Sequence, residues 1–459
     1  MRFADSVGRI VPLAWPVFIG QLAVLAFATI DTVFVARSSA ADLAALAIGS
    51  AAFVTVFIGF MGVVMALGPI VGRLFGAGDL AQAGRAVHKA VWVAIALSAV
   101  GSTLLLFPQP FLTLAQASPE VAGKVRLYLT ALAFSLPASL LFTIFRGFNT
   151  AVSRPKAAML IQVGGLALKV PLSAALVFGV PALGIPALGV AGCGVATAVS
   201  MWAQVAIGWM VLRRDPFYER FALFGRGLDR PEAAAIKAQL KLGIPMGSSI
   251  LIDVTGFAFM AIFIARLGTT AVAGHQLAAN LVSLMFMVPL ALGNATGALV
   301  AQRLGARDAR DADRLAWHGL GLACAIAALL SLGVLAGRVP ILSLYTADGA
   351  VIAAALPLLA WLAVFHVADA AAAVAAAVLR AHQIALVPVL IYAFALWGVG
   401  MGGGWLLAFD TSGHVPAALR GAPGYWVAST AALTVAAIGL TLLMRFTLRV
   451  RPGALPVAA

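Results

Sequence analysis

Residues 243–265 read GIPMGSSILIDVTGFAFMAIFIA, an almost wholly apolar run with a single charged residue, Asp253. A helix needs about 20 mostly apolar residues to cross the hydrocarbon core of a membrane, and this run is long enough. Apolar and polar residues do not alternate along it, so a transmembrane β-strand is not indicated. The run predicts a membrane-spanning helix. Asp253 is the first candidate functional residue, because a charge inside the membrane is costly and usually serves a function.

The composition of the whole chain agrees with this interpretation. Of its 459 residues, 63% are hydrophobic and only 10% are charged, and the mean hydropathy is +1.05. A soluble protein usually carries about 25% charged residues. The net charge of +14 comes from Lys and Arg in short connections between apolar runs, which indicates orientation in a membrane and argues against nucleic-acid binding. Cys193 and Cys324 lack metal-binding spacing and are predicted to be packing residues.

We predict an all-α polytopic membrane protein with twelve transmembrane helices in two six-helix lobes. The expected spans are residues 10–36, 43–72, 86–107, 125–145, 157–179, 188–212, 243–265, 270–301, 315–336, 350–379, 384–408 and 424–446. No cleavable leader pattern precedes the first span, so we expect it to be a retained helix. Most of the Lys and Arg residues fall on the cytoplasmic side if the N-terminus is inside, which predicts that both termini are cytoplasmic.

Three short motifs recur at a nearly constant spacing and indicate an internal repeat. The pairs are LFGA at 74–77 with RLGA at 303–306, each followed by an aspartate (Asp79, Asp308); Arg146 and Pro155 with Arg380 and Pro388; and GCGVA at 192–196 with GYWVA at 424–428. We expect an N-terminal lobe over 1–213, a cytoplasmic linker over 214–241, a C-terminal lobe over 242–450 and a tail over 451–459, with the lobes related by a pseudo-two-fold repeat. Two such bundles are the architecture used for alternating access.

Three acidic residues, Asp31, Asp253 and Asp369, are expected well inside the apolar spans. Asp253 and Asp369 belong to the same predicted lobe. Two carboxylates that converge on one cavity can bind Na+ through oxygen ligands, or one of them can hold a proton. The alternative is structural, with each carboxylate capping a broken helix or hydrogen-bonding to a neighbouring span.

Two further groups are expected near these acids. Lys169 lies in the middle of a span and cannot easily reach the membrane surface, so we expect it to pair with an internal acid; Asp31 is the only intramembrane candidate in that lobe. Such a pair can hold the charge that a coupling cation carries elsewhere, or it can be purely structural. His366 lies one helical turn from Asp369 and can either shuttle protons or form a hydrogen bond across helices.

The chain has no GxxxxGK[ST] phosphate loop, no HExxH motif, no nucleophile elbow and no paired-histidine haem pattern. We therefore expect neither an enzyme nor a resident cofactor, and we expect transport to be driven by an ion gradient or by the substrate's own gradient. A scaffold or receptor without turnover is the alternative from another class, and the three intramembrane acids argue against it.

Several stretches resemble the multidrug and toxic compound extrusion (MATE) family of secondary transporters, in its bacterial drug-exporting branch. They are residues 16–21, 30–33, 43–49, 145–148, 189–197, 243–255, 274–276, 286–289 and 379–380, together with Asp369. The resemblance implies two six-helix lobes, a monomer in the bacterial inner membrane, and export of cationic amphipathic compounds in antiport with H+ or Na+. A flippase for lipid-linked or other amphipathic precursors is the alternative, because a similar fold serves that role in the wider superfamily.

The resemblance also implies roles for individual residues. Asp253 falls where relatives have a cation-coordinating glutamate, Asp369 matches a second coordinating aspartate, and Asp31 matches the first-lobe acid. All three are therefore expected to be ion-coupling residues, and Na+ can bind at Asp253 and Asp369. The substrate-binding set implied is Gln276, Asp348, Asp31, Asp369 and Phe365. The chain departs from the family pattern in three ways: Asp253 is shorter than glutamate, Phe365 replaces a common tyrosine, and Lys169 and Ser173 replace two asparagines. These last two and His366 are candidate modulators of coupling.

Overall fold

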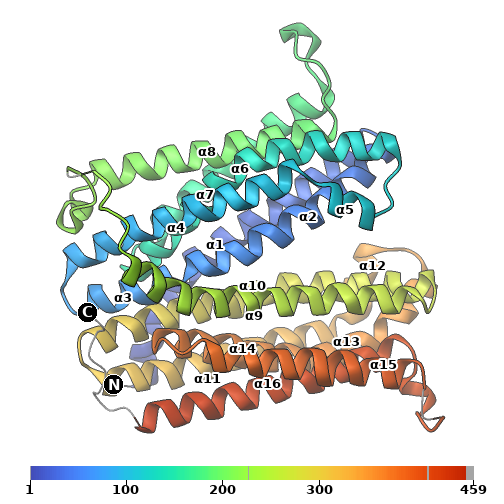
Figure 1. Cartoon of the computed structure of the whole chain (residues 1–459). Helices are drawn as coiled ribbons and strands as arrows, with labels where there is room; N and C mark the ends of the chain where they lie inside the picture. The colour runs from blue at the N-terminus through green and yellow to red at the C-terminus, as the bar shows by residue number, and fades with distance from the viewer. Residues whose placement is uncertain (1, 226, 411–412, 451–459) are drawn as a thin grey trace. The chain divides into compact units, whose positions relative to one another are not determined.

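The computed structural model describes residues 2–225, 227–410 and 413–450, and in these ranges the chain is helical with short connections (Figure 1). Twelve of the helical segments are long and apolar enough to cross a membrane, which confirms the expected number. The expected tail over 451–459, and Arg226 within the expected linker, lie outside the described residues.

The helices of the first half are α1 (Phe3–Ala36), α2 (Ala40–Met65), α3 (Leu67–Gly76), α4 (Leu80–Leu106), α5 (Gln109–Leu114), α6 (Pro119–Ala151), α7 (Pro155–Phe178), η1 (Pro181–Leu183), α8 (Val190–Arg214) and η2 (Pro216–Phe221). Those of the second half are α9 (Ala233–Ala265), α10 (Thr269–Gly305), α11 (Ala309–Ala336), α12 (Arg338–Tyr345), α13 (Gly349–Ala381), α14 (Leu386–Tyr392), η3 (Ala393–Gly402), α15 (Gly403–Ala408), η4 (Ala417–Leu419) and α16 (Ala422–Val450).

Three spans differ from the expected form. The expected span over 43–72 consists of α2 and α3, which meet at Ala66. Helix α9 begins at Ala233, inside the expected linker. Residues 233–241 include two lysines and a glutamine, so they are too polar to belong to an expected span, but Ala and Lys both favour a helix. The expected span over 384–408 consists of α14, η3 and α15, and its middle part, η3, is a π-helix. Such wider turns inside a helix often occur at functional sites.

The structure forms two compact units, which we call unit I (Ile19–Gly247) and unit II (Met1–Phe18 with Ser248–Ala459). This division differs from the expected lobes at the starts of α1 and α9. In unit II, Arg9 forms an ion pair with Asp311 of α11 (2.8 Å), so the first part of α1 packs with the second half of the chain. In unit I, the start of α9 packs against α2, where Gly247 lies so close to Gly59 that an added Cβ would clash with its carbonyl oxygen.

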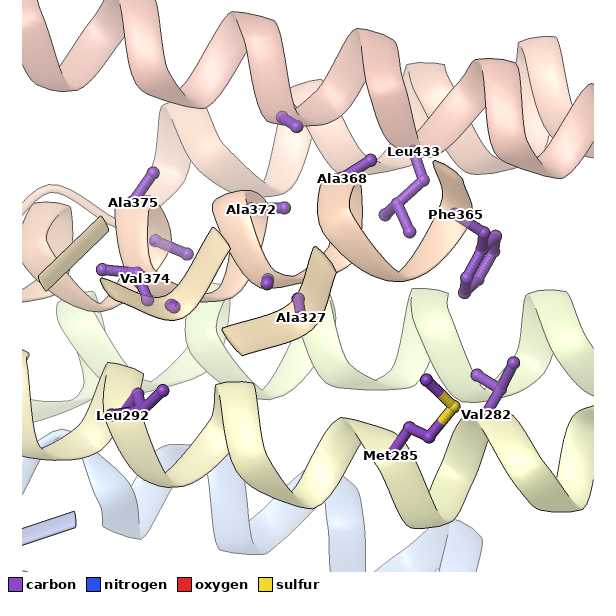
Figure 2. Close-up of a cluster of buried hydrophobic side chains, with 14 of the residues drawn as sticks. Val282, Met285, Leu292, Ala327, Phe365, Ala368, Ala372, Val374, Ala375 and Leu433 are labelled. Atoms are coloured by element: carbon purple, nitrogen blue, oxygen red, sulfur yellow. The ribbon is translucent and has the colours of Figure 1, made fainter. Parts of the chain in front are cut away.

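Helix α13 is the centre of unit II and packs against α10, α11 and α16. Figure 2 shows this core, in which Val282, Met285 and Leu292 of α10 and Leu433 of α16 face small residues of α13. Gly293 and Gly297 of α10 approach the backbone of Ala373 and Ala377 of α13, and only small residues allow two helices to come so close. The small residues therefore allow α10 to pack closely against α13, which carries Asp369.

Helix α6 has the same place in unit I, where it packs against α2, α4 and α8. Its buried face includes Tyr128, Leu132, Leu136 and Phe148. Gly194 of α8 lies against the main chain of Tyr128, another close approach that depends on a residue without a side chain.

The turns between paired helices confirm the internal repeat. Asp79 caps α4 by accepting a hydrogen bond from the Gln82 amide (3.0 Å), and Asp308 caps α11 in the same way through the Asp311 amide (3.1 Å). Gly78 (φ +78°) and Arg307 (φ +60°) precede these caps and both have left-handed backbone conformations. The repeat found in the sequence is thus a repeat of helix–turn–helix geometry.

Candidate functional site

The structure places Asp253 on α9, in the middle of a helix that continues without a break to Ala265. Its side chain is half-buried. The carbonyl of the preceding residue, Ile252, accepts hydrogen bonds from the Thr255 hydroxyl (3.3 Å) and from the Trp397 indole (3.3 Å). Asp253 therefore does not cap a broken helix, which excludes one of the two structural explanations for it.

Asp369 is half-buried on α13, within an unbroken stretch of helix. His366, one turn earlier, is fully buried, and neither of its ring nitrogens has a hydrogen-bond partner among the described residues. Phe365 is buried between the rings of Phe257 and Trp426, with centroid distances of 5.9 Å to each. Phe365 is thus a packing residue of the unit II core, where a tyrosine hydroxyl would need a partner.

Asp253 of α9 and Asp369 of α13 lie within electrostatic range of each other in unit II. Their charges act on one another, and both act on the hydroxyl of Tyr392 in α14. Within residues 2–225, 227–410 and 413–450, neither carboxylate forms an ion pair with Lys, Arg or His. Two neighbouring carboxylates without a basic partner repel each other when both are ionised, so the pair favours binding a proton or another cation.

Tyr392 is a member of this cluster that sequence reasoning missed. It lies at the last position of α14, next to the π-helical segment, and also interacts electrostatically with Arg380 of α13. The available signal was a tyrosine within an apolar span, but its position relative to Asp369 depends on the packing of helices that are separate in the sequence.

Unit I contains the third intramembrane acid. The Lys169 Nζ atom of α7 lies 2.8 Å from Asp31 Oδ2 of α1, which answers the question of which acid Lys169 meets. Both groups are buried, with relative exposures of 1% for Lys169 and 6% for Asp31. The ammonium also donates to the Phe27 carbonyl (3.3 Å) and lies 4.5 Å from the centre of the Phe27 ring.

Three other polar groups surround this pair. The Cys193 thiol of α8 lies beside the Asp31 carboxylate, and the Tyr128 hydroxyl of α6 is within reach of its charge. Ser173, one turn after Lys169, is fully buried and its hydroxyl has no partner in the described part of the chain. Cys193 is buried as expected, but its place next to Asp31 was not predicted, because α1 and α8 are far apart in the sequence.

The remaining two substrate candidates lie away from the acid pair. Asp348 is exposed and caps the start of α13 by accepting hydrogen bonds from the Ala350 and Val351 amides (2.8 and 3.4 Å). At a rise of 1.5 Å per residue, it lies about 30 Å along the helix from Asp369. Gln276 is exposed on α10 at the same end, where Tyr345 donates to Asn280 (3.2 Å). The structure therefore separates Gln276 and Asp348 from the acid pair.

Comparison with known proteins identifies the family of the chain. The model of the MatE family matches residues 16–175 and 245–406, which include all three intramembrane acids. The chain belongs to the MatE family. A relative from Aromatoleum aromaticum, "Probable multidrug resistance protein NorM", is 39% identical over 445 residues, covering 96% of this chain and 94% of the relative. "Multidrug resistance protein PmpM" from Pseudomonas aeruginosa is 32% identical over 450 residues, covering 96% and 92%.

Solved structures show the same fold. The crystal structure of the eukaryotic MATE transporter AtDTX14 matches with a TM-score of 0.86 and 19% sequence identity, over 97% of this chain and 98% of that one. The expected fold class of twelve transmembrane helices and the resemblance to MATE transporters are confirmed. This MatE protein is therefore a multi-pass membrane protein of a transporter family. The comparisons give no support to the flippase alternative.

Proposed function

We propose that this MatE protein exports cationic amphipathic compounds from the bacterial cytoplasm in antiport with H+ or Na+, with Asp253 and Asp369 as the ion-coupling pair. One observation carries the proposal: two half-buried carboxylates of unit II act on each other and have no basic partner among the described residues. The names of the relatives from Aromatoleum aromaticum and Pseudomonas aeruginosa, both multidrug resistance proteins, support the substrate class.

The chemistry of the pair allows one site to alternate between two kinds of cation. A proton or Na+ neutralises the carboxylates in one part of the cycle, and a cationic substrate competes for the same negative charge in another. A transporter couples the two when only the loaded forms reorient readily, because each ligand then shifts the conformational equilibrium by its differential affinity. Oxygen ligands suit Na+, and a carboxylate beside a second one suits H+, so the pair serves either ion.

The test is ethidium efflux from proteoliposomes under an imposed Na+ gradient or an imposed pH gradient. We expect efflux by the wild type to be driven by one of the two gradients. Asp253→Asn and Asp369→Asn should each reduce driven efflux by at least about tenfold, because an amide takes up no proton and lacks the negative charge that favours Na+. Glu120→Gln is the matched control, because it removes an exposed carboxylate in the first turn of α6 and leaves the pair intact. Absence of flux under both gradients with several lipophilic cations would overturn the proposal.

The orientation is part of the same proposal. The Lys and Arg distribution supports a protein with both termini in the cytoplasm. The family resemblance supports a monomer in the inner membrane. A reporter that is active only in the periplasm, fused after residue 450, tests the orientation. Activity of that fusion contradicts a cytoplasmic C-terminus, and a matched fusion in the connection between α1 and α2 provides the positive control.

A further inference from the structure

The Asp31–Lys169 pair differs chemically from the acid pair of unit II. Lys169 is 1% exposed and places its ammonium 2.8 Å from Asp31 Oδ2, with a second hydrogen bond to the Phe27 carbonyl and the Phe27 ring 4.5 Å away. Buried charges are stable only when they are paired and hydrogen-bonded, and this ammonium satisfies both conditions. The Asp31 carboxylate is therefore already paired with a cation, the ammonium of Lys169, which belongs to the same chain.

A tethered cation has an advantage over a diffusible one. Lys169 is held on α7 beside α1, so its effective concentration at Asp31 is set by the fold and does not depend on the medium. A Na+ ion or a proton from solution must displace an ammonium that remains within reach at every moment. A cation in the medium is therefore a poor competitor for Asp31.

The other described polar groups near the Asp31–Lys169 pair include no second basic side chain. These groups are the Cys193 thiol of α8 and the Tyr128 hydroxyl of α6. The Asp42 carboxylate of α2 acts at longer range on Cys193. Asp42 is itself held by Lys124 at 2.8 Å. Within the described residues, Lys169 is thus the only basic group recorded at Asp31.

We propose that Lys169 serves as a built-in counter-cation that keeps Asp31 neutralised, so that unit I takes up no coupling ion and the ion-dependent step is confined to Asp253 and Asp369. The second clause rests on the function proposed above. The first clause concerns Asp31 and Lys169 alone and can be tested without transport.

Removing Lys169 leaves a buried carboxylate without a partner, and such a group takes up a proton or another cation from the medium. We expect the infrared spectrum of purified Lys169→Met near neutral pH to contain a protonated-carboxyl band that is absent from the spectrum of wild type. The double variant Asp31→Asn with Lys169→Met must lack this band, which assigns it to Asp31. Lys169→Arg retains a cation at this position and must resemble wild type.

Transport gives the second readout. In proteoliposomes, Lys169→Met is expected to move one more cation per ethidium than wild type, measured from the membrane voltage at which net flux reverses. The double variant is expected to keep the wild-type ratio, because the site loses both charges at once. Lys124→Met is the control for loss of a lysine from another Lys–Asp pair in unit I, and it must leave the ratio unchanged.

Two results would overturn the proposal. One is a Lys169→Met protein with neither the additional carboxyl band nor a changed ion ratio. The other is a folded double variant that loses gradient-driven efflux, since Asp31 would then take part in coupling. If Lys169→Met does not fold, the double variant, which has no unpaired buried charge, still decides the question. Failure of the proposed function would appear separately, as absence of wild-type flux, and would leave the infrared comparison valid.

Discussion

The indole Nε1 of Trp397 donates a hydrogen bond of 3.3 Å to the main-chain carbonyl of Ile252, the residue immediately before Asp253. Trp397 lies in the π-helical segment η3, and its ring also packs edge-on against Phe259 of α9 at 5.2 Å. The irregular helix is therefore attached to α9 on either side of Asp253. This contact gives the π-helix a physical role, because it holds the backbone that carries Asp253, one of the two carboxylates proposed to couple transport to an ion.

We expect Trp397→Phe to weaken coupling while leaving the protein folded. Phenylalanine keeps the packing on Phe259 but removes the donor to Ile252, a contact worth about 1 kcal/mol. Because Asp253 is then held less firmly, the concentration of the driving ion that gives half-maximal efflux should rise several-fold. The matched control is Trp405→Phe in α15, an exposed tryptophan on the same span, which should behave as wild type. Equal effects of the two substitutions would contradict this role.

His366 leads to a prediction about stability. Its two ring nitrogens are buried without hydrogen-bond partners among the described residues, and an unpartnered buried polar group costs about 1–3 kcal/mol. His366→Leu should therefore leave the unfolding temperature of the purified protein unchanged or raise it. His275 of α10 is the contrasting histidine. It is buried and accepts a hydrogen bond from the Trp426 indole (3.3 Å), so His275→Leu should destabilise the protein. A large loss of stability in His366→Leu would show that the histidine has a partner.

The sequence predicted those features that depend on local composition. The twelve spans follow from the length of the apolar runs, and the paired turns at Gly78 and Arg307 follow from motifs that repeat along the chain. The pairing of Lys169 with Asp31 could be proposed by elimination, because a buried lysine needs an acid and its half of the chain offered one.

The remaining features depend on contacts between distant residues. The first turns of α1 belong to unit II because Ser6 meets His318 (2.7 Å) and Arg9 meets Asp311, and no local pattern in α1 encodes those partners. Tyr392 lies within electrostatic range of the acid pair although α14 is distant from Asp253 in the chain, and the wider turns of the π-helix that follows it leave the hydrophobic pattern of an apolar span unchanged. Sequence reasoning therefore named the charged candidates of the site, and the structure supplied their uncharged neighbours.

Tyr218 in the connection after α8 predicts a dependence of stability on alkaline pH. It is 1% exposed and donates to Asn149 Oδ1 at 2.5 Å, and its burial, together with the charge of Asp215, raises the pKa of Tyr218 to about 12. In the unfolded chain a tyrosine ionises near pH 10. The folded state prefers the neutral form, so its contribution to stability is complete below pH 10 and is lost as the pH rises toward about 12.

Tyr218→Phe should remove this alkaline dependence and, at neutral pH, lower the free energy of unfolding by about 1 kcal/mol for the lost hydrogen bond. Thermal unfolding of the purified protein over a series of pH values up to about 12 provides the measurement. Tyr345→Phe removes an exposed hydroxyl that also donates to an asparagine, so the variant should keep the wild-type profile. A Tyr218→Phe protein that still loses stability like wild type over this range would refute the assignment.

Gly192 on α8 tests whether the small residues of the spans are needed for close packing. A Cβ atom on Gly192 would lie 2.5 Å from the Leu176 carbonyl oxygen of α7, so the two helices must separate to accept alanine. Overpacking of this kind costs about 1–3 kcal/mol, and Gly192→Ala should lower the unfolding temperature. Gly164, an exposed position on α7, has no atom within 4 Å of an added Cβ, so Gly164→Ala should be neutral or stabilising by up to about 1 kcal/mol through helix propensity. Because both substitutions add the same methyl group, a destabilised Gly164→Ala or an unaffected Gly192→Ala would contradict the role of close packing between α7 and α8.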